Sequence, residues 1–368
     1  MVGLGLFFAS VTDPRAGNAR HDLSEVLFIA FAAILCGAES CVDMAAFGAA
    51  KAGVLGEILA LEHGIPSHDT FSRLFRLLDP VAFEAAFCRF MAHFAATLAG
   101  QVGTAGQIIA LDGKSLRGAV DGAKRTQPLH LVSLWAAEQR LVLHLKRAPE
   151  RNEAQAARDI IALLDLTATT ITADALHGNR ATAAAIRAHG GDYALAIKGN
   201  RGPLHRDMQN LTENADPAQA ALTVDKSHGR SEERRACVVP VPAAWRALHK
   251  FDGLAAVARI KASREIGGQK TEQVRYYALS RVLDPAEALR VVRAHWSIEN
   301  NQHWLLDVAF GEDRAQTRND RTAENLAVLR RLALNLLRAD PAKGSLRVKI
   351  KKAGWQNDYL IKLLSQMR

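Results

Sequence analysis

Residues 106–115 read GQIIALDGKS, and residues 168–175 read ATTITADA. In each stretch, four or five apolar or strand-forming residues lead directly into an aspartate, Asp112 in the first and Asp174 in the second. We therefore expect two β-strands that each end at a carboxylate. In an open α/β sheet, ligands bind beyond the carboxyl ends of the strands. Taken alone, either aspartate also fits the simpler role of capping the turn after its strand.

The sequence around these two strands alternates between strand and helix patterns. Residues 128–148 predict a β-hairpin that turns near Glu138 and Gln139. Helices are expected over 153–165 and in ATAAAIRAHG, and a further strand over 192–200 ends in polar groups. Strands interleaved with helices indicate an α/β fold built around one sheet.

A segment between about residues 202 and 280 carries mostly β patterns. Apolar or alternating runs at 234–241, 254–263 and 272–280 predict strands, with helical or loop segments between them. Helical spacing returns from Asp284 to Arg338. We interpret the β-rich segment as an insertion into the α/β domain.

Residues 1 to about 100 have helical spacing. A helix is expected from about 42 to 61, and in GIPSHDTFSRLFRLLDP (64–80) Ser67 is placed to cap another. Arg73 and Arg76 fall on the side of that helix opposite its apolar residues. A short helix opened by Ser67, His68 and Thr70 is typical of a DNA-reading helix and equally of a packed helical cap. A boundary is expected at the glycines 100, 103 and 106.

A third acidic element lies in RAHWSIENNQHWLLDVAFGED (293–313). Glu299 and His303 are four residues apart, which predicts that they share one face of a helix. A helix that brings an acid to two strand-end acids is what two-metal phosphoryl transfer requires. Carboxylate oxygens suit Mg²⁺ or Mn²⁺, and adjacent acids need a cation between them. The alternative is that His295, His303 and the two tryptophans of this stretch are interior packing.

The charge of the chain favours a polyanionic partner. Forty-seven Lys and Arg against 38 Asp and Glu give a net charge of +9, and neutralising phosphates releases counterions. From Arg314 to the end, 13 basic residues face only four acids. We interpret this tail either as a strip that follows a DNA backbone or as a solvated helix face.

The four cysteines form no CxxC pair and no zinc pattern, which favours a reduced, intracellular compartment. The apolar opening MVGLGLFFAS is interrupted by Asp13, Pro14 and Arg15, and the run from Val26 to Cys36 is too short to span a bilayer. We expect no signal peptide, no membrane span and a cytoplasmic protein.

Six stretches resemble, in the same order, the motifs of bacterial insertion-sequence DDE transposases, with the H-repeat-associated type as the nearest group. They read ALDGKSLRGA, TADALHGNR, YALAIKGNR, HGRSEERR, RYYALS and HWSIENNQHWLLDVAFGEDRAQTRND. GIPSHDTFSRLF is also similar to the small helical domain that precedes the catalytic domain in that family, so the resemblance runs from about residue 22 to 338.

The resemblance implies an α/β fold with a ribonuclease-H-like catalytic core and a β-rich insertion. Its implied organisation is a helical domain over 1–100 with DNA binding as its candidate role, a catalytic domain over 101–340 with the insertion at about 202–280, and a basic tail over 341–368. It assigns two metal ions, Mg²⁺ or Mn²⁺, to Asp112, Asp174 and Glu299. The wider superfamily places Tyr, Arg and Lys at fixed steps around the last acid, where this chain has Val292, His295 and Leu306. A hairpin-forming step that depends on those residues is therefore in doubt.

The implied reaction is hydrolysis at a transposon end followed by attack of the freed 3′-hydroxyl on target DNA. The implied partners are the terminal inverted repeats and the target, with a homodimer or larger assembly on DNA near the nucleoid. A nuclease of the same fold that does not join strands, and a catalytically idle DNA-binding remnant, remain open. Four residues just beyond expected strand ends are candidate phosphate contacts, Lys114, Arg117, Lys198 and Arg201, of which Lys114 and Arg117 could equally be turn residues. In HGRSEERR, either His228, Arg230 and Arg234 approach the DNA backbone while Glu232 pairs an arginine, or the segment is a solvated charged hairpin. Arg293 and His303 are further candidate DNA contacts.

Overall fold

The computed structural model describes residues 7–98, 107–120, 128–213, 215, 220–227, 230–317 and 319–365, apart from residues 9, 16 and 18. Three sequence-based expectations fall outside this part of the chain. They concern most of the apolar opening, the boundary glycines at 100, 103 and 106, and His228.

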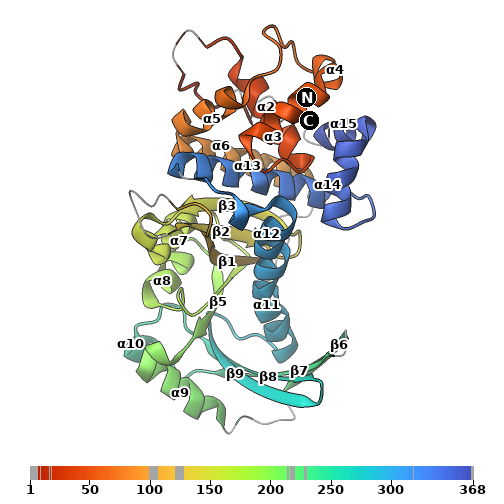
Figure 1. Cartoon of the computed structure of the whole chain (residues 1–368). Helices are drawn as coiled ribbons and strands as arrows, with labels where there is room; N and C mark the ends of the chain where they lie inside the picture. Colours follow the sequence, from red (N-terminus) through yellow and green to blue (C-terminus); the bar gives the residue numbers. More distant parts are fainter. Residues whose placement is uncertain are drawn as a thin grey trace.

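The N-terminal part of the chain is helical, as expected (Figure 1). Ser67 accepts a hydrogen bond from the Thr70 amide and caps its helix, confirming that prediction. The single helix expected over 42–61 is wrong, because the chain breaks at Lys51 into two shorter helices. The helices here are α2 (Leu23–Leu35), α3 (Cys41–Ala50), α4 (Ala52–Gly56), α5 (His68–Leu77) and α6 (Pro80–Leu98).

One mixed sheet of nine strands forms the centre of the described fold, in the order β3-β2-β1-β4-β5-β9-β8-β7-β6. The strand pairs β1–β4 and β4–β5 are parallel, and the other neighbours are antiparallel. The strands are β1 (Gln107–Leu116), β2 (Leu129–Ala136), β3 (Leu141–Arg147), β4 (Thr169–Ala173), β5 (Asp192–Ile197), β6 (Ala221–Ser227), β7 (Arg230–Pro240), β8 (Ala256–Ile266) and β9 (Gln269–Leu279).

Strand β1 does not end at Asp112, so that part of the sequence-based prediction is wrong. The antiparallel partner β2 continues alongside it, pairing Asp112 with Ser133 and Leu116 with Leu129. The parallel pairing with β4 does stop, at Leu111 opposite Ala173. Asp112 therefore lies in a continuous strand, at the point where its parallel neighbour ends.

The β-rich segment extends the same sheet rather than forming a separate one, because β9 pairs with β5. Helix α9 (Gly202–Glu213) precedes the first strand of this segment, and α10 (Trp245–His249) lies between β7 and β8. Strands β7, β8 and β9 continue the sheet away from the helical end of the molecule (Figure 1).

Helices cover both faces of the central strands. Apolar residues of α7 (Glu153–Ile161) and α8 (Arg180–Ala188) pack with β1, β4 and β5 on one face. On the other face, α11 (Pro285–Ile298) packs with β1 and the inserted strands. It runs into a π-helical turn, η4 (Glu299–His303), and then α12 (Trp304–Phe310). Short 3-10 turns lie at Pro149–Arg151, Gly199–Arg201 and Glu312–Arg314.

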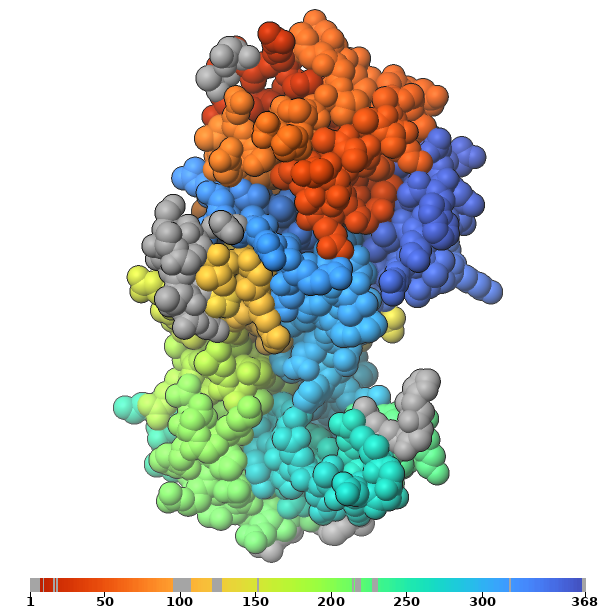
Figure 2. Space-filling view, in the orientation of Figure 1, coloured from red at the N-terminus to blue at the C-terminus, as the bar shows by residue number. Residues whose placement is uncertain are grey.

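The C-terminal segment folds back onto the N-terminal helices, where Figure 2 shows its blue surface against red and orange. The helices are α13 (Asp320–Ala339), α14 (Leu346–Trp355) and α15 (Asn357–Ser365), and they share one core with α2, α5 and α6. The basic tail is therefore helical, and Lys349 within it is buried and donates to the carbonyls of Leu337 and Asp340. Among the described residues, no helix is both long and apolar enough to cross a membrane.

Candidate acidic active site

Strand pairing places the two aspartates side by side. Leu111 and Ala173 are the last parallel partners of β1 and β4, and the next residues are Asp112 and Asp174. The Asp112 carboxylate accepts a hydrogen bond from the Gly113 amide at 2.9 Å, and Asp174 accepts one from the Leu176 amide at 2.9 Å. Each aspartate thus makes a local turn-type bond, while the sheet brings the pair together.

Glu299 reaches the same end of the strands on the helix that crosses β1. The Trp135 indole of β2 donates to Ser297 at 2.9 Å, and Gln302 donates to Ser133 at 2.9 Å. These two bonds fix the helix to β2 on both sides of Glu299. The sequence predicted a regular helical face shared by Glu299 and His303, but the structure has a π-helical turn over these residues. Such turns occur mostly as single insertions in α-helices, frequently at functional sites.

The three carboxylates share one electrostatic environment. Burial raises the pKa of Asp112 to about 8; the Gly113 amide opposes this, and the charges of Asp174, Glu153 and Glu299 add to it. The pKa of Glu299 is also raised, by burial and by Asp174, against the lowering effect of Arg275. Like charges raise one another's pKa only when they are close. The acids that the sequence singled out are therefore near one another in the fold.

This arrangement fits a divalent cation, whose charge would relieve the repulsion among the acids. The donor set is oxygen-rich, as Mg²⁺ and Mn²⁺ prefer. Within the described part of the chain, however, no three His, Cys, Asp or Glu side chains converge tightly enough to hold an ion between them as they stand. Glu299 is the exposed member of the three, so closing the set would require its side chain to move inward.

His303 and His295 border the acids as neutral groups. The Nδ1 atom of His303 lies 3.6 Å from the Asp112 carboxylate. Burial, with the charges of Arg331 and Lys114, lowers the pKa of His303 to about 3, so this contact is not an ion pair at neutral pH. Burial likewise lowers the pKa of His295 to about 4. His303 is thus held beside Asp112 as a neutral imidazole.

A fourth carboxylate that sequence reasoning missed lies next to Asp112. Glu153, at the start of α7, bonds to His130 Nε2 at 2.6 Å and to His177 Nε2 at 2.8 Å. His130 in turn contacts Ser115 Oγ at 2.9 Å. Burial opposes ionisation of Glu153, but the two histidines outweigh it and hold its pKa at about 2. No local motif signals this cluster, because its members come from four separate segments.

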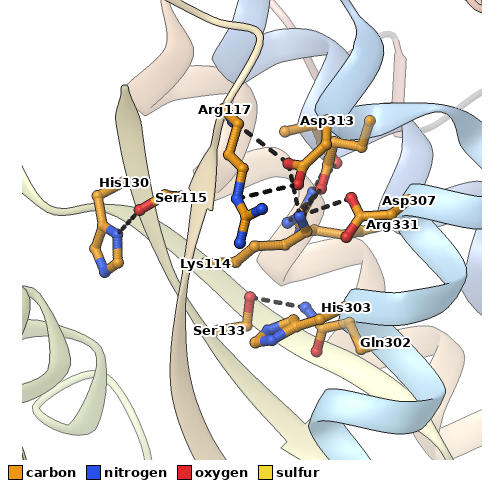
Figure 3. Close-up of polar contacts among 12 residues, drawn as sticks. Lys114, Ser115, Arg117, His130, Ser133, Gln302, His303, Asp307, Asp313 and Arg331 are labelled. Carbon is orange, nitrogen blue, oxygen red and sulfur yellow. Dashed lines mark hydrogen bonds and ion pairs between the residues drawn. The ribbon is translucent and has the colours of Figure 1, made fainter. Parts of the chain in front are cut away.

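Lys114 and Arg117, expected as phosphate contacts, face an acidic cluster (Figure 3). Lys114 is only 7% exposed, and its ammonium lies 2.7 Å from Asp307 and 3.0 Å from Asp313. Arg117 is largely exposed and lies 3.6 Å from Asp313. Arg117 therefore remains accessible to a ligand, whereas Lys114 is enclosed.

The other expected DNA contacts are divided between two surfaces. Lys198 and Arg201 are exposed beyond β5, and Arg201 donates to the Gly178 carbonyl at 3.0 Å. Arg234 pairs with Glu232 at 2.6 Å, which confirms the expected arginine pairing. Arg293 pairs with Asp225 at 3.0 Å. Arg230 begins β7.

A groove of about 880 Å³ runs between the inserted strands and α11 and reaches Glu299. Arg234 and Arg293 line it, and the Arg275 guanidinium lies 4.3 Å from the Trp296 ring centre. Acids line it too, among them Asp225 and Glu272. The groove therefore offers paired charges and an aromatic face directly beside Glu299.

The three positions where the wider superfamily has Tyr, Arg and Lys are buried. Val292 is 4%, His295 7% and Leu306 0% exposed. His295 and Leu306 pack inside the fold, whereas Val292 contributes to the lining of the groove.

Comparison with known proteins places the whole chain in one family. A family model described as Transposase DDE domain matches residues 103–336, and a model of a segment associated with that domain matches residues 6–91. The YncI protein of Escherichia coli O157:H7, named as a candidate transposase, is 32% identical over 95% of this chain and 91% of its own. YhhI of Escherichia coli K12, named as a candidate H repeat-associated transposase, is 31% identical over 95% and 93%.

Among solved structures, the piggyBac transposase synaptic complex with hairpin DNA is similar over 99% of this chain and 81% of that chain, with 10% identity and a TM-score of 0.46. That score is too low for an argument about fold. The sequence comparisons suffice: the chain belongs to the DDE transposase family.

Proposed function

We propose that this protein is an active DNA transposase whose Asp112, Asp174 and Glu299 cut a phosphodiester at each transposon end and join that end to target DNA. The observation that carries the proposal is that Asp112 and Asp174 directly follow Leu111 and Ala173, the last parallel partners of β1 and β4. Burial raises the pKa of Asp112, and the charges of Asp174 and Glu299 add to that rise. Acids that disfavour one another's ionisation are costly, and functional sites are where such arrangements concentrate.

The catalytic core in this proposal is ribonuclease-H-like. In support, three antiparallel strands are followed by two parallel ones, in the order β3-β2-β1-β4-β5, with α7 before β4 and α8 before β5. The segment from α9 to β9 is then the insertion, and it precedes Glu299 in the chain. The helices of residues 1–100 remain a proposed DNA-binding domain.

The proposed reaction has two in-line displacements at phosphorus. In the first, water attacks phosphorus and the bond between phosphorus and the 3′-oxygen breaks, leaving a 3′-hydroxyl at the transposon end. In the second, that hydroxyl attacks a target phosphodiester and releases the target's own 3′-oxygen. Two bound Mg²⁺ or Mn²⁺ ions would activate the attacking oxygen and stabilise the leaving one. Asp112, Asp174 and Glu299 would hold them, so all three must be ionised in the working enzyme.

The neighbouring residues keep these acids in place. Gly113 holds Asp112 through its amide, and Gln302 and Ser297 fix the helix of Glu299 on β2. In this scheme His303 packs beside Asp112 as a neutral imidazole.

DNA would reach the acids along the groove beside Glu299 and over the exposed residues that follow β1 and β5. The proposed phosphate contacts are Arg117, Lys198, Arg201, Arg234 and Arg293, with Arg230 at the start of β7 and His228, which lies outside the described residues. Arg234 and Arg293 must exchange their carboxylate partners for phosphates, which predicts salt-sensitive binding. Two DNA ends are joined in one event, so we propose a dimer or larger assembly on DNA.

Joining of the cut end to target DNA distinguishes a transposase from a nuclease that does not join strands and from an idle DNA-binding remnant. Purified protein would be incubated with Mn²⁺, labelled duplexes from both ends of its own element and a supercoiled target plasmid. A transposase yields 3′-hydroxyl ends and label covalently attached to plasmid. Cleavage without attached label supports a nuclease that does not join, and binding without cleavage supports an idle remnant.

A further inference from the structure

The residue two positions after Asp112 performs a role that no motif assigns. Alternate residues of a strand point to the same face, so Asp112 and Lys114 both face the helix that follows Glu299. Asp112 meets His303 at 3.6 Å, and Lys114 meets Asp307 at 2.7 Å. His303 and Asp307 are one helical turn apart, so strand and helix touch at two successive steps.

Lys114 is held by acids on several sides. Its ammonium lies 2.7 Å from Asp307, 3.0 Å from Asp313 and 4.0 Å from Glu312. Glu312 is itself fully buried and paired with Arg331 at 2.7 Å. A buried ammonium is costly unless it is paired in this way. A phosphate could reach Lys114 only by displacing these carboxylates, so contact with DNA is a poor account of its role.

The acids around Lys114 lie next to the π-helical turn that carries Glu299. The π-helical turn from Glu299 to His303 inserts one residue into the helix, so the position of Glu299 is not set by regular helix geometry. Gln302 bonds to Ser133, which is paired across the sheet with Asp112. Lys114 and Asp307 provide the matching anchor one step further along (Figure 3).

We propose that Lys114 is a positioning residue: its ion cluster with Asp307 and Asp313 sets the place of Glu299 relative to Asp112. The inference rests on the proposed function of those acids. The cluster itself touches neither DNA nor the reacting atoms.

The test compares Lys114→Met with Lys198→Met, which removes an exposed lysine beyond β5. Three quantities would be measured: the Mn²⁺ concentration giving half of the metal-induced rise in Tm, the Mn²⁺ dependence of end cleavage, and the salt dependence of duplex binding. We expect Lys114→Met to need about 10- to 100-fold more Mn²⁺, the range for changes next to metal ligands, with duplex affinity and its salt slope unchanged. Lys198→Met should lower the salt slope by about one and leave the Mn²⁺ midpoint unchanged.

A reduced salt slope in Lys114→Met with an unchanged Mn²⁺ midpoint would overturn the proposal in favour of a phosphate contact. A lower Tm of metal-free Lys114→Met with an unchanged Mn²⁺ midpoint would also overturn the proposal. Lys114 would then stabilise the fold without affecting the position of Glu299. If Lys114→Met does not fold, the test uses Asp307→Asn instead. This variant removes the charge of Asp307 and keeps the ion pair between Lys114 and Asp313. Asp307→Asn should also raise the Mn²⁺ concentration at the midpoint of the Tm rise. An unchanged Mn²⁺ midpoint in this variant would count against the proposal. A wild-type protein with no Mn²⁺ response and no cleavage would instead refute the proposed function itself.

Discussion

Leu111 of β1 and Ala173 of β4 are the last parallel partners of their two strands, and an aspartate follows each of them. Backbone pairing, rather than any local motif, therefore makes Asp112 and Asp174 neighbours. Glu299 is added by a helix that crosses the sheet. Burial raises the pKa of Asp112, and the charges of Asp174, Glu153 and Glu299 add to that rise.

Replacing Asp112 with Asn should stabilise the metal-free protein at pH 8. The pKa of Asp112 rises from 3.8 to about 8 on folding, so the folded state binds the proton more tightly than the unfolded state. Stability associated with this group is therefore present below pH 4 and lost as the pH rises towards 8. The expected gain is on the order of 1–3 kcal/mol, a value discounted from about 1.4 kcal/mol per pKa unit.

Urea unfolding of both proteins in EDTA, at pH 5 and pH 8, measures this gain. The variant should exceed the wild type more at pH 8 than at pH 5. Added Mn²⁺ should stabilise the wild type and have a much smaller effect on the variant. A gain that is the same at both pH values would contradict the assignment of a raised pKa to Asp112.

Glu153→Gln should destabilise the protein at pH 7 by about 1–3 kcal/mol, because His130 and His177 lose a charged partner. The folded-state pKa of Glu153 is about 2, below its ordinary 4.5. Its contribution is therefore present above pH 4.5 and lost as the pH falls towards 2. Unfolding free energies at pH 7 and pH 3 should show a smaller difference at pH 3. Glu62→Gln, at an exposed position, is the control and should change neither value.

Gly113→Ala should destabilise the fold by about 1–3 kcal/mol, the usual range for overpacking. A Cβ at this position would collide with the Glu153 carboxylate and with His130 Nε2. Gly53→Ala is the matched control, since a Cβ there meets nothing within 4 Å and lies in helix α4. Thermal denaturation should show opposite effects, with the control slightly more stable. Equal effects would mean that the approach of α7 to β1 is not tight.

Glu312→Leu should cost about 3–5 kcal/mol, because it leaves the fully buried Arg331 without its partner. Adding Arg331→Met should recover most of the loss, since two apolar side chains of similar size often replace a buried ion pair well. A double-mutant cycle measured by urea unfolding gives the coupling. Strictly additive losses would show that the two residues do not stabilise each other.

Local patterns predicted several elements correctly, and their limits have a common cause. The turn between β2 and β3, the end of β4 at Asp174 and the Ser67 cap all depend on residues within one segment. The continuation of β1 beyond Asp112 depends on pairing with β2, and the burial of Lys114 depends on acids almost 200 positions away. The Glu153 cluster joins four segments in the same way. Asp112 and Asp174 were singled out because each follows an apolar, strand-forming run, and Glu299 because it lies in a helical pattern; their catalytic role stays a prediction.

The central claim, one catalytic site made by three acids, is tested most directly by end cleavage in single variants. Asp112→Asn, Asp174→Asn and Glu299→Gln would be compared with the exposed control Glu62→Gln in Mn²⁺, with folding checked by thermal denaturation. The account predicts that the rates of cleavage and joining fall in each of the three variants by well over 100-fold, whereas a supporting residue would lower them by at most roughly 100-fold. The control should keep both rates. Cleavage at the wild-type rate by any one of the three folded variants would contradict it.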